Sequence, residues 1–231
     1  MTPQPMTTRP TTDRSQRTII DLSHPLSAAT QAFPGDPPVA ITIFDSTSTA
    51  STAGERHLNC SHLAMSLHCG THMDAPFHFF GDGLTIDRVL LEHTMGPTVH
   101  LRLPWTTDGL TIEPRHLAAY ESQLRSARRV VLNTAWHHRW GADNYFTEHP
   151  LITGAAGQLL VDWGVVLVGV DTPSVDRPPF EAHLALLGNG VLIVENLTNL
   201  DAIPGDLFEL IATPLKIAGR DGSPVRALAI V

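Results

Sequence analysis

His68-Cys69-Gly70-Thr71-His72-Met73-Asp74-Ala75-Pro76-Phe77-His78 places three histidines and one aspartate within eleven consecutive residues. These four candidate ligands lie at even offsets, so an extended backbone, whose side chains alternate, would direct all of them to one face. A helix is the poorer interpretation, because Pro76 would lose a backbone hydrogen bond and Gly70 is a weak helix former. A straight strand is insufficient too, because at about 3.3 Å per residue a four-residue offset separates two imidazoles by about 13 Å, whereas a ligand lies about 2 Å from its ion. We therefore expect the chain to fold back on itself, with Gly70 and Pro76 as the bends.

The donor atoms of this stretch indicate a metal site. A lone histidine is an ordinary residue at a surface or in a half-buried position. Four candidate ligands separated by even numbers of residues, however, favour binding of one metal ion by the group. Imidazole and carboxylate together suit zinc, manganese or iron, and a carboxylate can bridge two ions. Residue types alone leave it open whether all four side chains bind metal.

Length and composition set broad limits on the protein. A chain of 231 residues with 42% hydrophobic content is long enough for one large domain with a buried core. The formal net charge of −8 argues against nucleic acid as a partner, because phosphate binding needs clustered Lys and Arg. Two cysteines, Cys60 and Cys69, are too few for a disulfide framework. Because no apolar run approaches the roughly 20 residues that span a bilayer, we expect no membrane association and a cytoplasmic location.

Residues 1–17 are rich in Thr, Pro, Gln and Arg and have almost no large apolar residue. They cannot bury enough surface to offset the entropy lost on ordering, which predicts a disordered N-terminal tail. Residues 18–231 are expected to form one domain. Within it, residues 45–56 are mostly Ser, Thr, Ala and Gly, a composition typical of a flexible loop.

The rest of the chain alternates between short apolar runs and amphipathic segments, which predicts a single α/β domain. The amphipathic spacing predicts helices over 113–128 and 153–163, with Thr153 as the cap of the second. The C-terminal region 207–231 is expected to form two strands joined by a hairpin turn at 220–223. Strands are predicted at 18–22, 39–44, 62–67, 97–103, 129–133, 165–170 and 191–194.

Polar residues follow the most apolar of these strands. The segment 165–170 reads as the centre of a sheet and ends in a polar loop at 171–176, which precedes a helix containing His183. Glu195 stands at the end of the strand 191–194, where open sheets often place ligands. The adjacent pair His137 and His138 could also bind metal, but neighbouring residues point apart and no acidic residue stands at ligand spacing, so surface or pocket lining is favoured.

Three stretches together carry a resemblance to a known family. The motif 68–78, the segment Gly169-Val170-Asp171-Thr172-Pro173-Ser174 and the segment Glu195-Asn196-Leu197 resemble the metal-dependent cyclase family, which includes bacterial kynurenine formamidases and isatin hydrolase. The similarity runs from about Ile20 to the C-terminus. It implies the swivelling β/β/α fold of that family and two divalent metal ions per subunit, with zinc as the default for hydrolysis and manganese as the alternative. We also expect a homo-oligomer, a dimer or a tetramer.

The resemblance further implies which residues bind the metal ions and which residue transfers the proton. In the matching positions the first ion is held by His68, His72 and Asp74, and the second by His183. Asp74 and Glu195 would bridge the pair, and His78 would be the general acid and base. At Phe33 the formamidases commonly carry a tryptophan that packs on the substrate, so this chain departs from the family there.

The activity implied is metal-dependent amide hydrolysis. The metals would polarise the amide carbonyl and activate water, while a histidine held off the metals passes a proton to the leaving nitrogen. The first choice of substrate is N-formyl-L-kynurenine, an aromatic amide of tryptophan catabolism, with Phe33, Phe77 and Trp136 expected to supply an aromatic surface. The alternative is a ring-opening hydrolase acting on a cyclic amide such as isatin.

Two other classes of protein remain open from the residues. A binding protein with a purely structural metal would be expected to use a closed tetrahedral site, usually with cysteine thiolates, which this motif does not offer. An iron-dependent oxygenase would need two histidines and one carboxylate, and the expected bridging role of Glu195 argues against it. Activity in the absence of oxygen would exclude the oxygenase.

Overall fold

Four strands rich in apolar residues form the parallel centre of a sheet. In the computed structural model, which describes residues 17–45, 59–106 and 109–231, they lie side by side in the order β5, β7, β9 and β10. Every residue of β9 and β10 is buried, as expected for strands covered on both faces. Their bounds are Met95–Arg102 for β5, Arg129–Asn133 for β7, Leu167–Val170 for β9 and Leu192–Glu195 for β10.

Antiparallel strands extend this centre on both sides, so that the whole sheet has nine strands. Beyond β5 follow β11 (Leu207–Ile211), β13 (Leu228–Ile230) and β1 (Ile19–Asp21). Beyond β10 follow β4 (His72–Asp74) and β12 (Gly222–Pro224). The predicted α/β class is confirmed, and the sheet is of mixed type.

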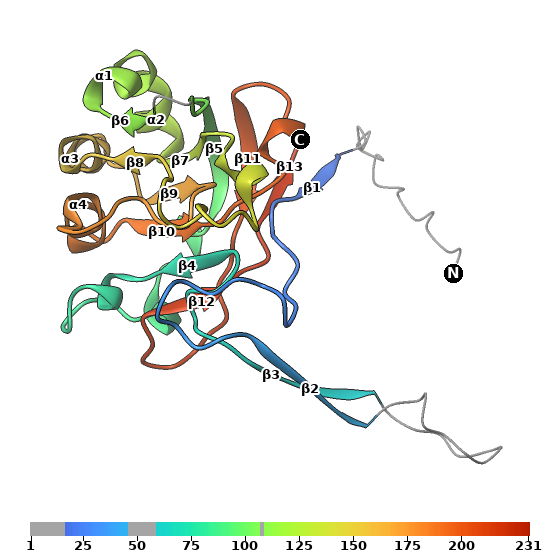
Figure 1. Cartoon of the computed structure of the whole chain (residues 1–231). Coiled ribbons are helices and arrows are strands. Elements are labelled where there is room, and N and C mark those ends of the chain that lie inside the picture. The colour runs from blue at the N-terminus through green and yellow to red at the C-terminus, as the bar shows by residue number, and fades with distance from the viewer. Residues whose placement is uncertain (1–16, 46–58, 107–108) are drawn as a thin grey trace, which may run out of the picture.

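The α-helices lie together on one face of the sheet (Figure 1). Their bounds are Pro114–Leu117 for α1, Glu121–Ala127 for α2, Gly154–Asp162 for α3 and Glu181–Gly188 for α4. As predicted, Thr153 caps α3, because its hydroxyl accepts from the amide of Ala156 at 3.1 Å. The helix predicted over 113–128 is interrupted by the 3₁₀ turn η5 (Ala118–Tyr120), although Leu117 and Leu124 still pack in the core.

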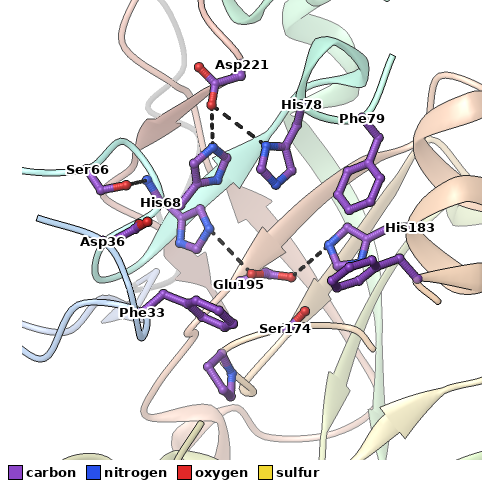
Figure 2. Close-up of a pocket in the computed structure, with 13 residues that line it drawn as sticks. Phe33, Asp36, Ser66, His68, His78, Phe79, Ser174, His183, Glu195 and Asp221 are labelled. Carbon is purple, nitrogen blue, oxygen red and sulfur yellow. Dashed lines mark hydrogen bonds and ion pairs between the residues drawn. The ribbon is translucent and has the colours of Figure 1, made fainter. Parts of the chain in front are cut away.

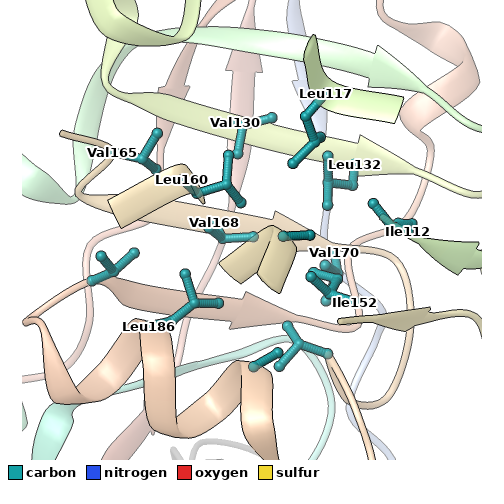
Figure 3. Close-up of a cluster of buried hydrophobic side chains, with 14 of the residues drawn as sticks. Ile112, Leu117, Val130, Leu132, Ile152, Leu160, Val165, Val168, Val170 and Leu186 are labelled. Atoms are coloured by element: carbon teal, nitrogen blue, oxygen red, sulfur yellow. The ribbon is translucent and has the colours of Figure 1, made fainter. Parts of the chain in front are cut away.

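Strand alternation divides the core into two layers. Val130, Leu132 and Val168 point to the helical side, where they pack with Leu160 and Leu186 of the helices (Figure 3). On the opposite face, the neighbours of these strand residues join a second cluster. Its members include Met73, Val131, Leu167, Val194 and Leu210. The ends of β4 and β10, which carry the candidate ligands, are therefore anchored from both sides.

Two pairs of short strands lie outside the main sheet. The hairpin of β2 (Ala40–Asp45) and β3 (Cys60–Ala64) extends away from the body of the domain (Figure 1). The strands β6 (Thr111–Ile112) and β8 (Leu151–Ile152) pair in parallel. Because β3 ends at Ala64, the strand predicted over 62–67 does not continue into the histidine motif. The remaining 3₁₀ turns are η2 (Pro76–His78), η3 (Ile86–Arg88), η4 (Leu91–His93), η6 (Trp136–Arg139) and η7 (Leu200–Ala202).

The prediction of a C-terminal hairpin with its turn at 220–223 is wrong. The partner of β11 is β13, whereas β12 crosses to the other edge of the sheet and pairs with β4. In this register Gly222 lies opposite Asp74 and Pro224 opposite His72. A Cβ atom at Gly222 would come within 2.9 Å of the carbonyl oxygen of Met73, so a glycine permits the close approach.

Two sequence predictions fall mostly on parts of the chain that the structure does not describe. The predicted tail 1–17 lies outside the described residues except for Arg17, and the predicted flexible loop 45–56 lies outside them except for Asp45. Within the described ranges, no helix has the length and apolar content needed to cross a membrane.

Candidate metal centre

The histidine motif folds back on itself at the two residues expected to bend it. Gly70 has a φ of 68°, in the left-handed region that favours glycine, and it follows the turn that carries His68. After the three residues of β4, Pro76 opens the 3₁₀ turn η2, which ends at His78. The motif is thus a turn, a short strand and a second turn, and this path brings its donor atoms together.

Two groups of potential ligand atoms meet at one carboxylate. The donor atoms of His72, Asp74 and Glu195 lie within 4.8 Å of one another, and so do those of His68, Asp74 and His78. Asp74 belongs to both groups. Because β10 and β4 pair with Glu195 opposite His72, the sheet register itself delivers the second carboxylate (Figure 2).

The ring of His72 is held so that one nitrogen faces the carboxylates. Its Nδ1 donates to the carbonyl oxygen of Gly70 at 2.9 Å. Its Nε2 lies 3.4 Å from Asp74 Oδ1 and 3.4 Å from Glu195 Oε2. A backbone acceptor on the far nitrogen is the usual arrangement of a histidine that binds metal.

His183 reaches the same carboxylates from the first turn of α4. Its Nδ1 donates to Asp176 Oδ1 at 2.5 Å, and its Nε2 lies 3.6 Å from Glu195 Oε1. Glu195 therefore lies between His72 and His183, and its Oε1 also accepts from the amide of Val175 at 3.1 Å. Sequence reasoning missed Asp176, which in the sequence was only one of several polar residues in the loop 171–176.

His68 and His78 close the other side of the site. The Nδ1 of His68 lies 2.7 Å from Asp74 Oδ1, and its Nε2 lies 2.6 Å from Asp221 Oδ2. His78 stacks on His68 with 4.0 Å between ring centroids, and its Nδ1 is 3.8 Å from the same oxygen of Asp221. Sequence reasoning also missed Asp221, because this residue stood in a predicted turn 153 residues beyond His68.

The electrostatics of the site call for positive charge. Asp74 and Glu195 are only 1% and 4% exposed, and among the described residues that line the pocket there is no lysine or arginine. Burial opposes the ionisation of Asp74, but His68 and His72 outweigh it and hold the pKa of Asp74 well below its usual value. Burial likewise opposes the charging of His183, but Asp176 and Glu195 raise its pKa to about 10.

These observations fit divalent cations. In the protein alone, protonated histidines balance the two buried carboxylates. A divalent ion can take over that balance, since neutral imidazole and carboxylate are the ligands that zinc and manganese accept. The donor set and its burial therefore match the metal centre expected from the sequence.

A pocket of about 520 Å³ opens above these side chains. Three aromatic residues line it, Phe33, Phe79 and Phe180, together with polar residues that include Asp36 and Ser174. Phe33 is 42% exposed and makes an edge contact with Phe146. The predicted position of Phe33 at the substrate pocket agrees with this geometry.

The expectation that Phe77 and Trp136 line the same pocket is wrong. Trp136 is fully buried, where its Nε1 donates to the carbonyl oxygen of Tyr145 at 3.0 Å. Phe77 lies in the middle of the 3₁₀ turn η2, and it is Phe79, one residue after this turn, that lines the pocket. The alternation of a strand does not continue through the turn, so it does not predict which phenylalanine faces the site.

Comparisons with known proteins agree with this geometry. Residues 20–177 match the family model Cyclase, described as "Putative cyclase". A protein named kynurenine formamidase from Paracidovorax citrulli is 35% identical over 219 residues, which cover 92% of this chain and 96% of the relative. Another of that name, from Bordetella petrii, is 36% identical and covers 91% and 96%.

Solved structures give the same result. Isatin hydrolase A from Labrenzia aggregata, bound to benzyl benzoate, superposes with a TM-score of 0.80 at 29% identity, covering 93% of this chain and 94% of that one. An isatin hydrolase bound to the product analogue thioisatinate has a TM-score of 0.77 at 26% identity, with coverage of 94% and 93%. On its sequence and its fold alike, the chain belongs to the cyclase family.

Proposed function

We propose that this chain is a metal-dependent arylformamidase that hydrolyses N-formyl-L-kynurenine to L-kynurenine and formate. The observation that carries the proposal is the convergence of Asp74 and Glu195 with a ring of histidines beneath a pocket lined by aromatic side chains. Curated relatives at 33–36% identity over nine-tenths of the chain are named kynurenine formamidase, which supports the same activity.

The proposed centre binds two divalent ions, with zinc as the default and manganese as the alternative. His68, His72 and Asp74 would hold the first ion and His183 the second, while Asp74 and Glu195 serve both. The presence of Asp74 in two donor groups and the place of Glu195 between His72 and His183 support this sharing. When bound, such ions polarise the amide carbonyl and make water more acidic.

His78 is the proposed general acid and base. Burial lowers its pKa more than the carboxylate of Asp74 raises it, so the ring is neutral and able to accept a proton near neutral pH. Its side chain is 32% exposed at the pocket, within reach of a substrate. It would take a proton from the attacking water and deliver it to the departing aniline nitrogen. Asp221, 3.8 Å from its Nδ1, would keep the ring oriented.

The pocket offers partners for an aryl formamide with an amino-acid tail. Phe33, Phe79 and Phe180 supply apolar faces for the aryl ring. Asp36, in the same loop as Phe33, provides a carboxylate for the ammonium group of the tail, and the hydroxyl of Ser174 provides a donor for its carboxylate. A compact neutral lactam would use the aromatic faces alone.

Hydrolysis of a cyclic amide such as isatin is the second candidate, because solved structures named isatin hydrolase share the fold at 26–29% identity. The two functions separate in one experiment. Enzyme loaded with zinc, and in parallel with manganese, is assayed without oxygen on N-formyl-L-kynurenine and on isatin. We expect the higher kcat/KM for the formamide. A preference for isatin would assign the chain to the second candidate, and a requirement for oxygen would refute hydrolysis altogether.

The chain is further proposed to act in the cytoplasm as a homo-oligomer, a dimer or a tetramer. Light scattering of the purified protein measures the assembly, and a monomeric mass at working concentration would contradict it.

A further inference from the structure

A second group of metal-ligating side chains lies apart from the pocket. Donor atoms of His137, His138 and Asp201 lie within 4.8 Å of one another, and none of these residues lines the pocket described above. The two histidines are adjacent in sequence, and the aspartate comes 63 residues after His138. The cluster therefore exists only in the folded chain.

The local backbone explains why two adjacent histidines converge. On a strand they would point to opposite faces, but both lie in the 3₁₀ turn η6, where their ring centroids are 4.1 Å apart. Asp201 lies in the turn η7, which follows β10, whereas η6 follows β7. Because β7 and β10 run in the same direction in the sheet, the turns that follow them both lie at the end of the sheet where the parallel strands terminate.

Both imidazoles approach the same oxygen of Asp201. The Nε2 of His138 lies 2.7 Å from Asp201 Oδ2, and the Nε2 of His137 lies 3.6 Å from the same oxygen. When an ion is bound tetrahedrally with metal–ligand bonds of about 2 Å, its ligand atoms lie about 3 to 3.5 Å from one another. His138 is exposed, so a small rotation of its ring would lengthen the distance between its Nε2 and Asp201 Oδ2 to that range.

A buried carboxylate orients His137 as a ligand. Asp171 is fully buried, and its Oδ2 lies 3.0 Å from His137 Nδ1. Because a carboxylate accepts hydrogen bonds, His137 donates from Nδ1 to Asp171, and its Nε2 is the ring nitrogen that faces Asp201. The other oxygen of Asp171 accepts from the amide and the hydroxyl of Thr134, which fixes its position.

Asp201 is held in a similar way. Its Oδ1 accepts from Asn133 Nδ2 at 3.0 Å, which leaves Oδ2 for the cluster. Such supporting contacts behind His137 and Asp201 distinguish a built metal site from a chance ion pair.

We propose that His137 Nε2, His138 Nε2 and Asp201 Oδ2 bind one transition-metal ion of the zinc class, separate from the catalytic centre. Two imidazoles and one carboxylate are a complete protein ligand set for zinc, with water in the remaining position. The side chains of His138 and Asp201 are 61% and 55% exposed, so the ion can enter from solvent. Bound there, it would tie the turn after β7 to the turn after β10 and stabilise the folded chain.

The test counts metal ions. The purified full-length protein is equilibrated with Zn²⁺ at buffered micromolar free concentration, and bound zinc is measured per chain. We expect His138→Ala and Asp201→Asn each to bind about one equivalent less than the wild type. His93→Ala is the matched control, because His93 belongs to none of the three-ligand groups found in the described ranges, and it should bind as much zinc as the wild type.

A second arm separates this site from the catalytic one. In His183→Ala, which removes the proposed ligand of the second catalytic ion, zinc should still raise the unfolding temperature, and adding His138→Ala should make that rise smaller, because the proposed first catalytic ion can still bind. Equal zinc content in wild type, His138→Ala and Asp201→Asn would overturn the proposal. So would binding to this cluster that requires millimolar zinc, since that would mark His138 and Asp201 as an ordinary surface ion pair.

Discussion

Replacing Asp176 by asparagine tests whether Asp176 orients the His183 ring for metal binding. Asp176 is 6% exposed, and its Oδ1 accepts from His183 Nδ1 at 2.5 Å. Its Oδ2 accepts from the backbone amides of Ala182 at 2.6 Å and of His183 at 3.3 Å, at the start of α4. The carboxylate therefore serves both as the orienting group of His183 and as a cap of the helix.

The asparagine separates these two roles. Its carbonyl oxygen can still accept from the backbone amides, whereas its NH₂ group takes the place of Oδ1. The imidazole of His183 must then accept at Nδ1 and carry its proton on Nε2, the atom that faces Glu195. Loss of such an orienting partner typically weakens metal binding or activity by about 10–100-fold. The cost at the helix end should stay within about 1 kcal/mol, because the cap is retained, but the metal-free protein also loses the contact between Asp176 and protonated His183.

Zinc affinity measured by competition with a chelator, together with kcat/KM and thermal unfolding of the metal-free protein, distinguishes the two effects. Asp162→Asn is the matched control, because Asp162 is exposed on α3 and its carboxylate accepts from Gln158 across one helical turn. We expect Asp176→Asn to lose zinc affinity, and we expect the metal-free variant to unfold at a lower temperature because its contact with protonated His183 is lost. Wild-type zinc affinity in this variant would refute the assignment of His183 as a ligand oriented by Asp176.

Three further predictions concern the same centre. Asp74→Asn should lower the metal content and abolish activity, because Asp74 is expected to serve both ions; full activity at unchanged metal content would contradict the sharing. His78→Ala should keep its metal and lose about 10²–10⁴-fold in turnover, as expected for a proton-transfer residue; loss of metal instead would make His78 a ligand. In the metal-free protein, Asp176 and Glu195 raise the pKa of His183 from 6.5 to about 10. Protonated His183 therefore contributes stability that is fully present below about pH 6.5 and is lost as the pH rises through about 10. Unfolding temperatures measured across this range should therefore fall with pH, and less steeply in His183→Ala, so equal slopes would count against the contacts of His183 with Asp176 and Glu195.

Residue types and spacing were enough to propose the chemistry of the metal centre. Offsets within 68–78 identified the donors and required the chain to bend, and the bends lie at Gly70 and Pro76. Glu195 could be predicted to lie near them, because a polar residue at the end of a buried strand lies where open sheets collect ligands. These inferences depend on side-chain type and on spacing along one short segment, which local geometry controls.

The distant side chains that support that centre became apparent only in the folded chain. Asp221 reaches His68 because β12 pairs with β4 rather than with β11, a choice of sheet edge that no local pattern encodes. His138 meets Asp201 for a similar reason, since the order of β7, β9 and β10 in the sheet brings two separate turns to one edge. Strand order and register come from the packing of the whole core, so contacts between residues far apart in the chain follow from the folded protein and not from spacing in the sequence.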